Sequence, residues 1–197
     1  MVISIVFVLN RENVLYLFHM KKIEKKTTKY KRPSWDDYFI DIAEQVAKRS
    51  KDPSTRTGCV IVDSKKRPVS FGYNGFIGGC DESKMSQERP MKYLLVIHSE
   101  MNAILFSKRD LENCVLYNLY VPCEYCLKYI IQAGIKKIIY KNSVVESKAN
   151  DNEKSMTNSL TNEAVTRILL SVPNVECRNL NGKSYLEEIW GDKVPKF

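Results

Sequence analysis

The sequence contains only two histidines, His19 and His98, and its six cysteines are irregularly spaced. Six such cysteines in a chain of 197 residues are too few for a disulfide scaffold. Three of them, Cys59, Cys114 and Cys177, lie in apolar or strand-like runs, where a free cysteine behaves as a small hydrophobic residue. We therefore expect reduced thiols and a cytoplasmic location.

Long hydrophobic runs are also absent. The apolar stretch MVISIVFVL is too short to span a bilayer, follows no basic segment and precedes no small-residue cleavage site. We therefore expect neither a membrane anchor nor a signal peptide. We also expect that Met20 is the start used in the cell and that residues 1–19 are an upstream extension of the reading frame.

Positive charge is abundant but unevenly placed. The net charge is +8, and most of it lies in KKIEKKTTKYKR, residues 21–32, where Glu24 is the single acidic residue. Such a balance suits a protein that meets phosphate groups. We expect residues 1–31 to be a flexible N-terminal extension with a basic leader, and residues 32–197 to form one domain. A nucleic-acid contact by the leader is the alternative.

Hydrophobic periodicity divides the remaining chain into helices and strands. An amphipathic helix capped by Ser34 precedes a predicted hairpin and a glycine-dense loop, residues 72–80, which a polar surface loop follows at 81–92. From His98 onward helices alternate with strands, which predicts an α/β domain with right-handed crossovers. From His98 onward the predicted helices are 98–108, 123–133, 162–170 and 184–190. The predicted strands of the whole chain are 58–64, 68–74, 115–120, 136–140 and 175–177. Residues 141–159 are predicted to be a polar connection.

Three metal-binding residues stand at the starts of two predicted helices. His98 opens one, in IHSEMNAI, and Cys123 and Cys126 open the other, in VPCEYC. Residues three apart share a helix face, Pro122 suits a first helical turn, and helix N-termini favour thiolates. A catalytic zinc ion usually has three protein ligands and one open position. The sequence therefore predicts a Zn²⁺ site at these three residues.

Glu100 follows the histidine by two residues and is not needed as a ligand. A glutamate there can carry a proton from water to a nitrogen of the substrate, while zinc makes that water acidic. Together the residues match the H-x-E…P-C-x-x-C signature of zinc nucleobase deaminases. The alternative is a closed structural zinc site with Cys80 as fourth ligand, or simply buried cysteines.

The motifs RPSWDDYF, AKRSKDPSTRTG, VIVD, GYNGF, HSEMNAI, PCEYC and IIQAGIKKIIY resemble, in this order, the deoxycytidylate deaminase family. The resemblance covers about residues 32–141 and, more weakly, the chain from 162 onward. It implies a cytidine-deaminase-like three-layer α/β/α fold with a mixed central sheet. It also implies that zinc bound by His98, Cys123 and Cys126, with Glu100 as proton carrier, hydrolyses dCMP to dUMP and ammonia, which supplies dUMP for dTMP synthesis.

We expect the free nucleotide dCMP to be the partner, with Asn74 on its deoxyribose. An amide in a turn with Gly72 and Gly75 can both donate to and accept from a sugar hydroxyl. Turn geometry alone is the other explanation of this asparagine. The candidates for the 5′-phosphate contact are Arg89, Lys92 and Lys128.

The family resemblance also implies regulation and assembly. Members are typically homohexamers activated by dCTP and inhibited by dTTP with Mg²⁺. The segments that resemble those of regulated members suggest four allosteric candidates: Lys51, Asp52, Gly79 and Cys80.

The chain departs from the family pattern in several places. Ser99 stands where alanine is usual, and we expect this change to be harmless. Ile77 replaces a proline, and Leu119 with Tyr120 replaces a smaller pair, which affects details of the substrate pocket. The connection 141–159 is longer than the family leads us to expect, which bears on subunit contacts.

Two rival functions remain at this point. One is a deaminase of bases in nucleic acid, of the tRNA adenosine or polynucleotide cytidine type, with the basic leader holding the RNA. The other is a non-catalytic zinc fold that binds nucleotides or partners. A purely structural site has no need of Glu100, so the complete motif favours the enzyme.

Overall fold

The structure, a computed structural model, describes residues 30–143 and 151–196, with no side-chain detail for 151–159. Residues Pro33–Phe197 form one compact unit. Met20 and nearly all of the basic leader lie outside the described residues. The proposed start at Met20 and the flexible extension over residues 1–31 therefore stay predictions.

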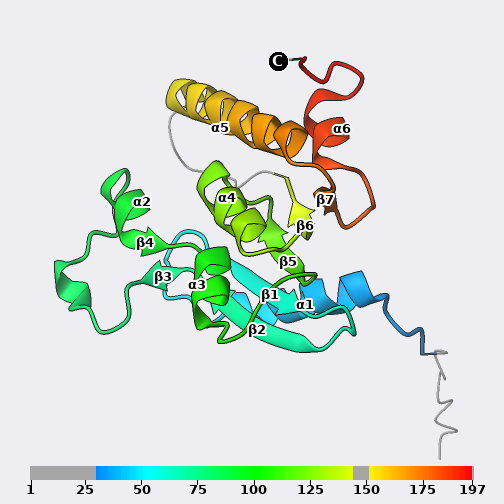
Figure 1. The fold of residues 1–197 in the computed structure, drawn as a ribbon. Helices are drawn as coiled ribbons and strands as arrows, with labels where there is room; N and C mark the ends of the chain where they lie inside the picture. Colours follow the sequence, from blue (N-terminus) through cyan, green and yellow to red (C-terminus); the bar gives the residue numbers. More distant parts are fainter. Residues whose placement is uncertain (1–29, 144–150, 197) are drawn as a thin grey trace, which may run out of the picture. The chain divides into compact units, whose positions relative to one another are not determined.

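A mixed five-stranded sheet forms the centre of the domain (Figure 1). Its strand order is β2 (Pro68–Tyr73), β1 (Gly58–Val62), β5 (Val115–Tyr120), β6 (Lys137–Asn142), β7 (Glu176–Asn179). Strand β1 pairs antiparallel with both β2 and β5, whereas β6 lies parallel to both β5 and β7. The predicted hairpin and the predicted mixed sheet are thus confirmed.

Helices cover both faces of this sheet. They are α1 (Trp35–Ala47), α3 (Ser99–Phe106), α4 (Glu124–Gln132), α5 (Asp151–Ser171) and α6 (Tyr185–Trp190). Helix α1 packs on one face, and residues of α3, α4, α5 and α6 share the core on the other. Helices α4 and α5 make the two crossovers that the parallel pairs require. The three-layer α/β/α fold is confirmed, and none of the described helices is long and apolar enough to cross a membrane.

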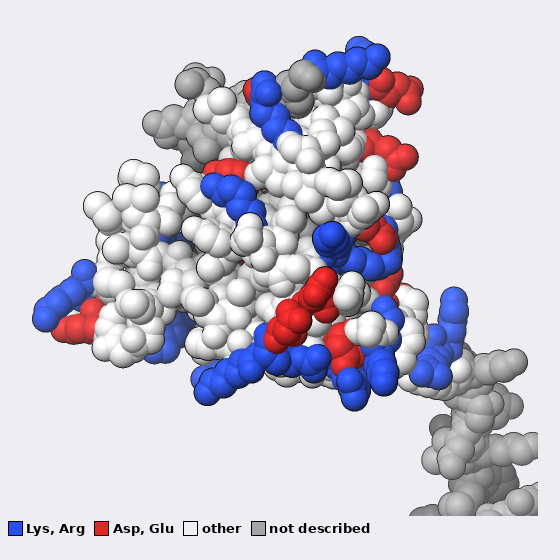
Figure 2. Space-filling view, viewed as in Figure 1, with Lys and Arg blue, Asp and Glu red and all other residues white. Residues whose placement is uncertain are grey.

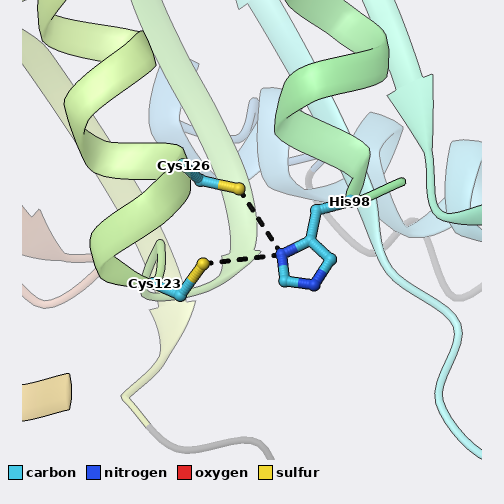
Figure 3. A group of neighbouring side chains, drawn as sticks. All are labelled: His98, Cys123 and Cys126. Carbon is cyan, nitrogen blue, oxygen red and sulfur yellow. Dashed lines mark hydrogen bonds between the residues drawn. The ribbon is translucent and has the colours of Figure 1, made fainter. Parts of the chain in front are cut away.

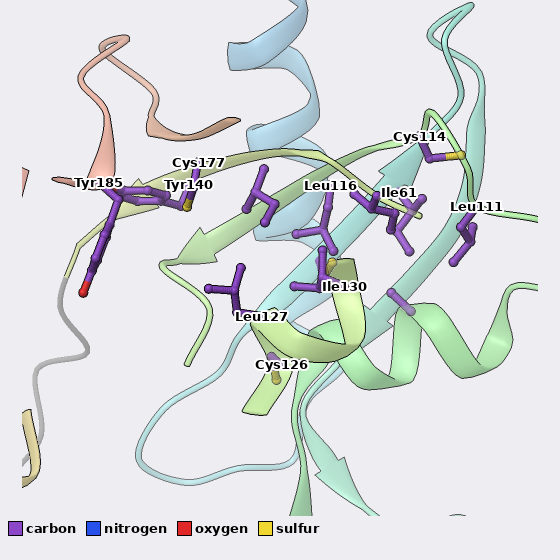
Figure 4. Close-up of a cluster of buried hydrophobic side chains, with 14 of the residues drawn as sticks. Ile61, Leu111, Cys114, Leu116, Cys126, Leu127, Ile130, Tyr140, Cys177 and Tyr185 are labelled. Carbon is purple, nitrogen blue, oxygen red and sulfur yellow. The ribbon is translucent and has the colours of Figure 1, made fainter. Parts of the chain in front are cut away.

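Strand alternation explains why the sheet has two cores. Successive side chains of a strand point to opposite faces, so Cys59 and Ile61 enter the core beside α3 and α4. Val60 and Val62 enter the core beneath α1. Figure 4 shows Ile61 within the first of these clusters. Because both faces are covered, β1 is a continuous apolar run rather than an alternating one.

Local side-chain chemistry fixes the helix ends where the sequence places them. The Ser34 hydroxyl accepts a hydrogen bond from the Asp37 backbone N–H at 3.1 Å and so caps α1. Ser184 and Glu187 form a capping box at the start of α6. After α4, Gly134 has a φ of +88°, a conformation that glycine adopts without strain.

Two sequence-based expectations about the secondary structure are wrong. Helix α5 begins at Asp151, inside the segment predicted to be a polar connection. Its first residues include few apolar ones, so they show no hydrophobic period. The loops predicted at 72–80 and 81–92 also contain regular secondary structure. Strand β3 (Gly75–Phe76) pairs with β4 (Val96–Ile97). The 3₁₀ helix η1 (Glu82–Lys84) and helix α2 (Met91–Leu95) lie between these two strands in the sequence.

Gly72 lies in β2, where the strand touches helix α3 rather than a ligand. A Cβ atom added here would lie 2.0 Å from the backbone oxygen of Ser99 and 2.3 Å from the backbone nitrogen of Ala103. Only a residue without a side chain allows this approach of strand and helix. Gly72 therefore sets the distance between the sheet and the helix that carries Glu100.

We expect Gly72→Ala to lower the free energy of unfolding by about 3 kcal/mol, because backbone atoms must move apart. Gly78→Ala is the matched control, since no atom lies within 4 Å of a Cβ added there. Its effect should stay within about 0.5 kcal/mol. Urea unfolding measures both, and equal stabilities for the two variants would contradict the close approach.

Candidate metal centre and active site

The structure brings the three predicted zinc ligands together. His98 is the residue that precedes α3, Cys123 precedes α4, and Cys126 lies in the first turn of α4. Figure 3 shows their side chains pointing toward one another, with Nδ1 of His98 nearest the sulfurs. This nitrogen lies 3.6 Å from Sγ of Cys123 and 3.4 Å from Sγ of Cys126.

These distances fit a zinc ion. Tetrahedral zinc, with Zn–S near 2.3 Å and Zn–N near 2.0 Å, places its nitrogen and sulfur ligands about 3.5 Å apart. Within residues 30–143 and 151–196, this is the one group of histidine, cysteine or acidic side chains identified as able to hold a metal ion. Three protein ligands leave a fourth position for water, as in a catalytic site. The ligand role of each residue stays a prediction.

The pKa values of His98, Cys123 and Cys126 depend on one another. A hydrogen bond with Cys126 and the neighbouring His98 lower the pKa of the Cys123 thiol to about 4. The hydrogen bond with Cys123 raises the pKa of His98 to about 9, and both Cys123 and burial raise the pKa of Cys126. The lowered pKa of Cys123 favours a thiolate, and a bound cation would displace the protons of its neighbours.

Glu100 lies in the first turn of α3, and only 5% of its surface is exposed. Its carboxylate oxygen Oε2 accepts a hydrogen bond from the Ser99 hydroxyl at 2.9 Å. Burial raises the pKa of this carboxyl, while the positive charge of His98 acts in the opposite direction. A raised pKa suits a group that must both accept and release a proton near neutral pH.

The Asn74 side chain forms hydrogen bonds with other residues of the protein. Its Oδ1 accepts from the Thr57 backbone N–H at 2.8 Å, and its Nδ2 donates to Oδ2 of Asp52 and to the Thr55 backbone oxygen. Both amide N–H bonds are therefore used, and only Oδ1 keeps accepting capacity. The contact with deoxyribose stays a prediction, and the turn-stabilising role is visible in the structure.

The four allosteric candidates line one cavity of about 220 Å³. Lys51 and Asp52 come from the segment after α1, whereas Gly79 and Cys80 come from the loop after β3. The fold therefore brings together two segments that the sequence separates by more than twenty residues. Asn74, which lies between β2 and β3, also lines this cavity.

The phosphate candidates occupy different environments. Lys92 is 4% exposed, and its ammonium group lies 2.6 Å from Asp52 and 2.6 Å from the Ser54 hydroxyl. The expectation that residues 81–92 form a surface loop is therefore wrong at Lys92, because a buried carboxylate stabilises its charge. Arg89 lies over the Tyr93 ring, with 5.4 Å between the guanidinium carbon and the ring centroid. Lys128 lies over another aromatic ring in α4.

Sequence reasoning missed one polar contact of the site. The Thr57 hydroxyl donates to the Ser99 hydroxyl at 3.0 Å, and the Ser99 hydroxyl donates to Glu100. The serine at position 99, in place of the usual alanine, was the available signal. Nothing in the sequence pairs Thr57 with a residue 42 positions away.

Comparison with protein families now bears on this geometry. Residues 33–142 match the model of the cytidine and deoxycytidylate deaminase zinc-binding region. The chain belongs to this family. A zinc-binding region at this site therefore agrees with the His–Cys–Cys group that the fold assembles.

Individual members of the cytidine and deoxycytidylate deaminase family match over different lengths. An uncharacterised deaminase of Aliivibrio fischeri is 47% identical over 104 residues, covering 53% of this chain and 70% of that protein. The deoxycytidylate deaminase of Mus musculus is 34% identical over 156 residues, covering 76% of this chain and 81% of that protein. The deoxycytidylate deaminase of Homo sapiens is 40% identical over 113 residues, covering 54% of this chain and 64% of that protein.

A solved structure supports the fold. The apo crystal structure of dCMP deaminase from the cyanophage S-TIM5 superimposes with a TM-score of 0.51 and 21% sequence identity. The match covers 76% of this chain and 100% of that one. It shows that the two chains share their architecture.

We expect the purified protein to hold about one zinc ion per chain, and Cys123→Ala to lose nearly all of it, because two ligands hold zinc weakly. Cys80→Ala is the matched control and should keep its zinc, since Cys80 lines the separate cavity. Elemental analysis after dialysis measures both. Equal loss from Cys80→Ala would instead indicate a closed four-ligand site.

Proposed function

We propose that this protein is a zinc-dependent deoxycytidylate deaminase that hydrolyses dCMP to dUMP and ammonia, and so supplies dUMP for dTMP synthesis. The observation that carries the proposal is the convergence of His98, Cys123 and Cys126 in the same active-site region as the buried Glu100. Support comes from relatives named deoxycytidylate deaminase, which are 34% and 40% identical to this chain.

The residues divide the chemistry between them. His98, Cys123 and Cys126 would hold the zinc ion, which when bound would supply the Lewis-acid chemistry that makes water nucleophilic at neutral pH. Glu100 takes a proton from the attacking water and delivers it to N3 of the pyrimidine as the oxygen bonds to C4. The second proton of that water passes through Glu100 to the amino group. Ammonia then leaves, and C4 keeps the oxygen as a carbonyl.

Substrate positioning is a further part of the proposal. Asn74 would accept a hydrogen bond from the deoxyribose hydroxyl through Oδ1, the atom that keeps accepting capacity. Of the phosphate candidates, Arg89 and Lys128 lie over exposed aromatic rings. Lys92 is committed to Asp52 and is not retained as a phosphate ligand.

We also propose that the protein is a cytoplasmic homohexamer that dCTP activates and dTTP inhibits, with Mg²⁺ accompanying the effectors. The cavity lined by Lys51, Asp52, Gly79 and Cys80 supports an effector site. Support for subunit contacts comes from large apolar side chains that are more than half exposed. They include Leu94, Leu105, Phe106, Tyr125 and Tyr129.

The alternative of a nucleic-acid base deaminase depends on a basic surface. Figure 2 shows Lys and Arg side chains interspersed with Asp and Glu on the face drawn, with wide uncharged areas between them. A surface built for phosphate backbones gathers its positive charge along one track. On the face drawn, the interspersed charge supports the free nucleotide as substrate.

We expect ammonia release from dCMP, and a loss of at least about 100-fold in kcat for Glu100→Gln, because the amide cannot carry the proton. The zinc content of this variant should be that of the wild type. Glu44→Gln, on the helix that covers the opposite face of the sheet, is the control. Release of ammonia from RNA but not from dCMP would reject the proposed substrate.

We expect Lys51→Ala to raise the dCTP concentration for half-maximal activation about tenfold, as the loss of one charge-assisted phosphate contact would. Lys84→Ala is the control, because each lysine pairs with a carboxylate, Lys51 with Glu82 and Lys84 with Asp81, but only Lys51 lines the cavity. Initial rates at a fixed dCMP concentration measure both. An identical dCTP response in both variants would contradict the effector site.

A further inference from the structure

The Ser99 hydroxyl is completely buried next to the carboxylate that carries the proton. Its exposed surface is 0%, and it donates to Oε2 of Glu100 at 2.9 Å. Its other acceptor, Oδ1 of Asn118, is more distant at 3.4 Å, so the single hydroxyl proton favours Glu100. Among the described residues, Ser99 is the one side chain found to donate to this carboxylate.

The Thr57 hydroxyl fixes the orientation of the Ser99 hydroxyl. Thr57 Oγ1 donates to Ser99 Oγ at 3.0 Å, and the Thr57 backbone N–H donates to Asn74 at 2.8 Å. Because Ser99 accepts from Thr57, its own proton is directed toward Glu100. Hydrogen bonds in such a directed chain strengthen one another in a protein interior.

We infer that Ser99, supported by Thr57, is a positioning residue for Glu100. Its hydroxyl holds Oε2 with a fixed donor and so restricts rotation of the carboxylate, which leaves Oε1 to exchange protons. A buried carboxylate without this donor would sample other orientations, and catalysis is sensitive to small displacements. The inference rests on the proposed function in its choice of substrate, but the orientation of the carboxylate can be measured without turnover.

The inference replaces the expectation that serine in place of alanine is harmless. Alanine fits the same backbone and lacks only the oxygen, so Ser99→Ala should fold and bind zinc. A merely structural hydroxyl would change stability alone. A positioning hydroxyl changes the environment of the Glu100 carboxyl carbon and the rate of the chemical step.

The first measurement is ¹³C NMR of zinc-loaded protein labelled at the glutamate carboxyl carbons, with Glu100→Gln identifying the Glu100 resonance. We expect Ser99→Ala to shift this resonance, and Thr57→Val to shift it less. Thr166→Val is the matched control. It removes another buried hydroxyl, which donates to the Asn162 backbone oxygen and accepts from Trp190 in α6.

The second measurement is dCMP turnover by the same proteins. We expect Ser99→Ala to lower kcat about tenfold, with KM within about twofold, because a hydrogen bond to a charged group is lost. Thr57→Val should lower kcat about threefold alone and cause no further loss in the Ser99→Ala background, because it acts through that hydroxyl. Thr166→Val should lower stability and leave kcat unchanged.

Each outcome decides the inference. An unshifted Glu100 resonance in Ser99→Ala overturns it, and so does an unchanged kcat or a loss from Thr57→Val that persists without Ser99. Should the wild type fail to deaminate dCMP while the resonance shifts as expected, the proposed substrate is rejected and the positioning role is supported.

Discussion

The meeting of two helix starts at one point is the constraint on which the rest of this structure depends. His98 ends the segment that leads into α3, and Cys123 ends the segment that leads from β5 into α4. The helices pack against each other on the same face of the sheet. Gly72 lets α3 approach β2 closely enough for this packing. Three predicted ligands from two separate segments thus meet at one point through ordinary strand and helix packing, at the carboxyl end of β5, where α/β folds commonly bind ligands.

A second constraint is that the polar groups beneath the site must all be satisfied. Hydrogen bonds connect Asp52 to Asn74, Asn74 to Thr57, Thr57 to Ser99, and Ser99 to Glu100. Within the described part of the chain, no buried side-chain nitrogen or oxygen lacks a partner. Because unpaired groups would be costly in this interior, the network fixes side chains that stand on different segments. It also joins the wall of the 220 Å³ cavity to the Glu100 carboxylate through hydrogen bonds.

Sequence reasoning succeeded where the controlling interactions are local. Helix caps, strand alternation and the spacing of Cys123 and Cys126 depend on neighbours a few positions apart, so the Ser34 cap and the approach of the two cysteines could be predicted directly. It failed where a distant partner decides the outcome. In the sequence Lys92 has the pattern of a surface residue, and only the fold places Asp52 beside it. Strands of two residues, such as β3 and β4, are too short to show a hydrophobic period. The beginning of α5 escaped because a polar helix leaves no apolar stripe.

We propose that one imidazole and two thiolates hold zinc, with a position left for water. X-ray absorption at the zinc edge of the purified protein tests it most directly. We expect two sulfur atoms near 2.3 Å, one nitrogen near 2.0 Å and one further light atom that changes when dCMP binds. A shell with three sulfur atoms, or one that dCMP leaves unaltered, would contradict an open catalytic site at His98, Cys123 and Cys126.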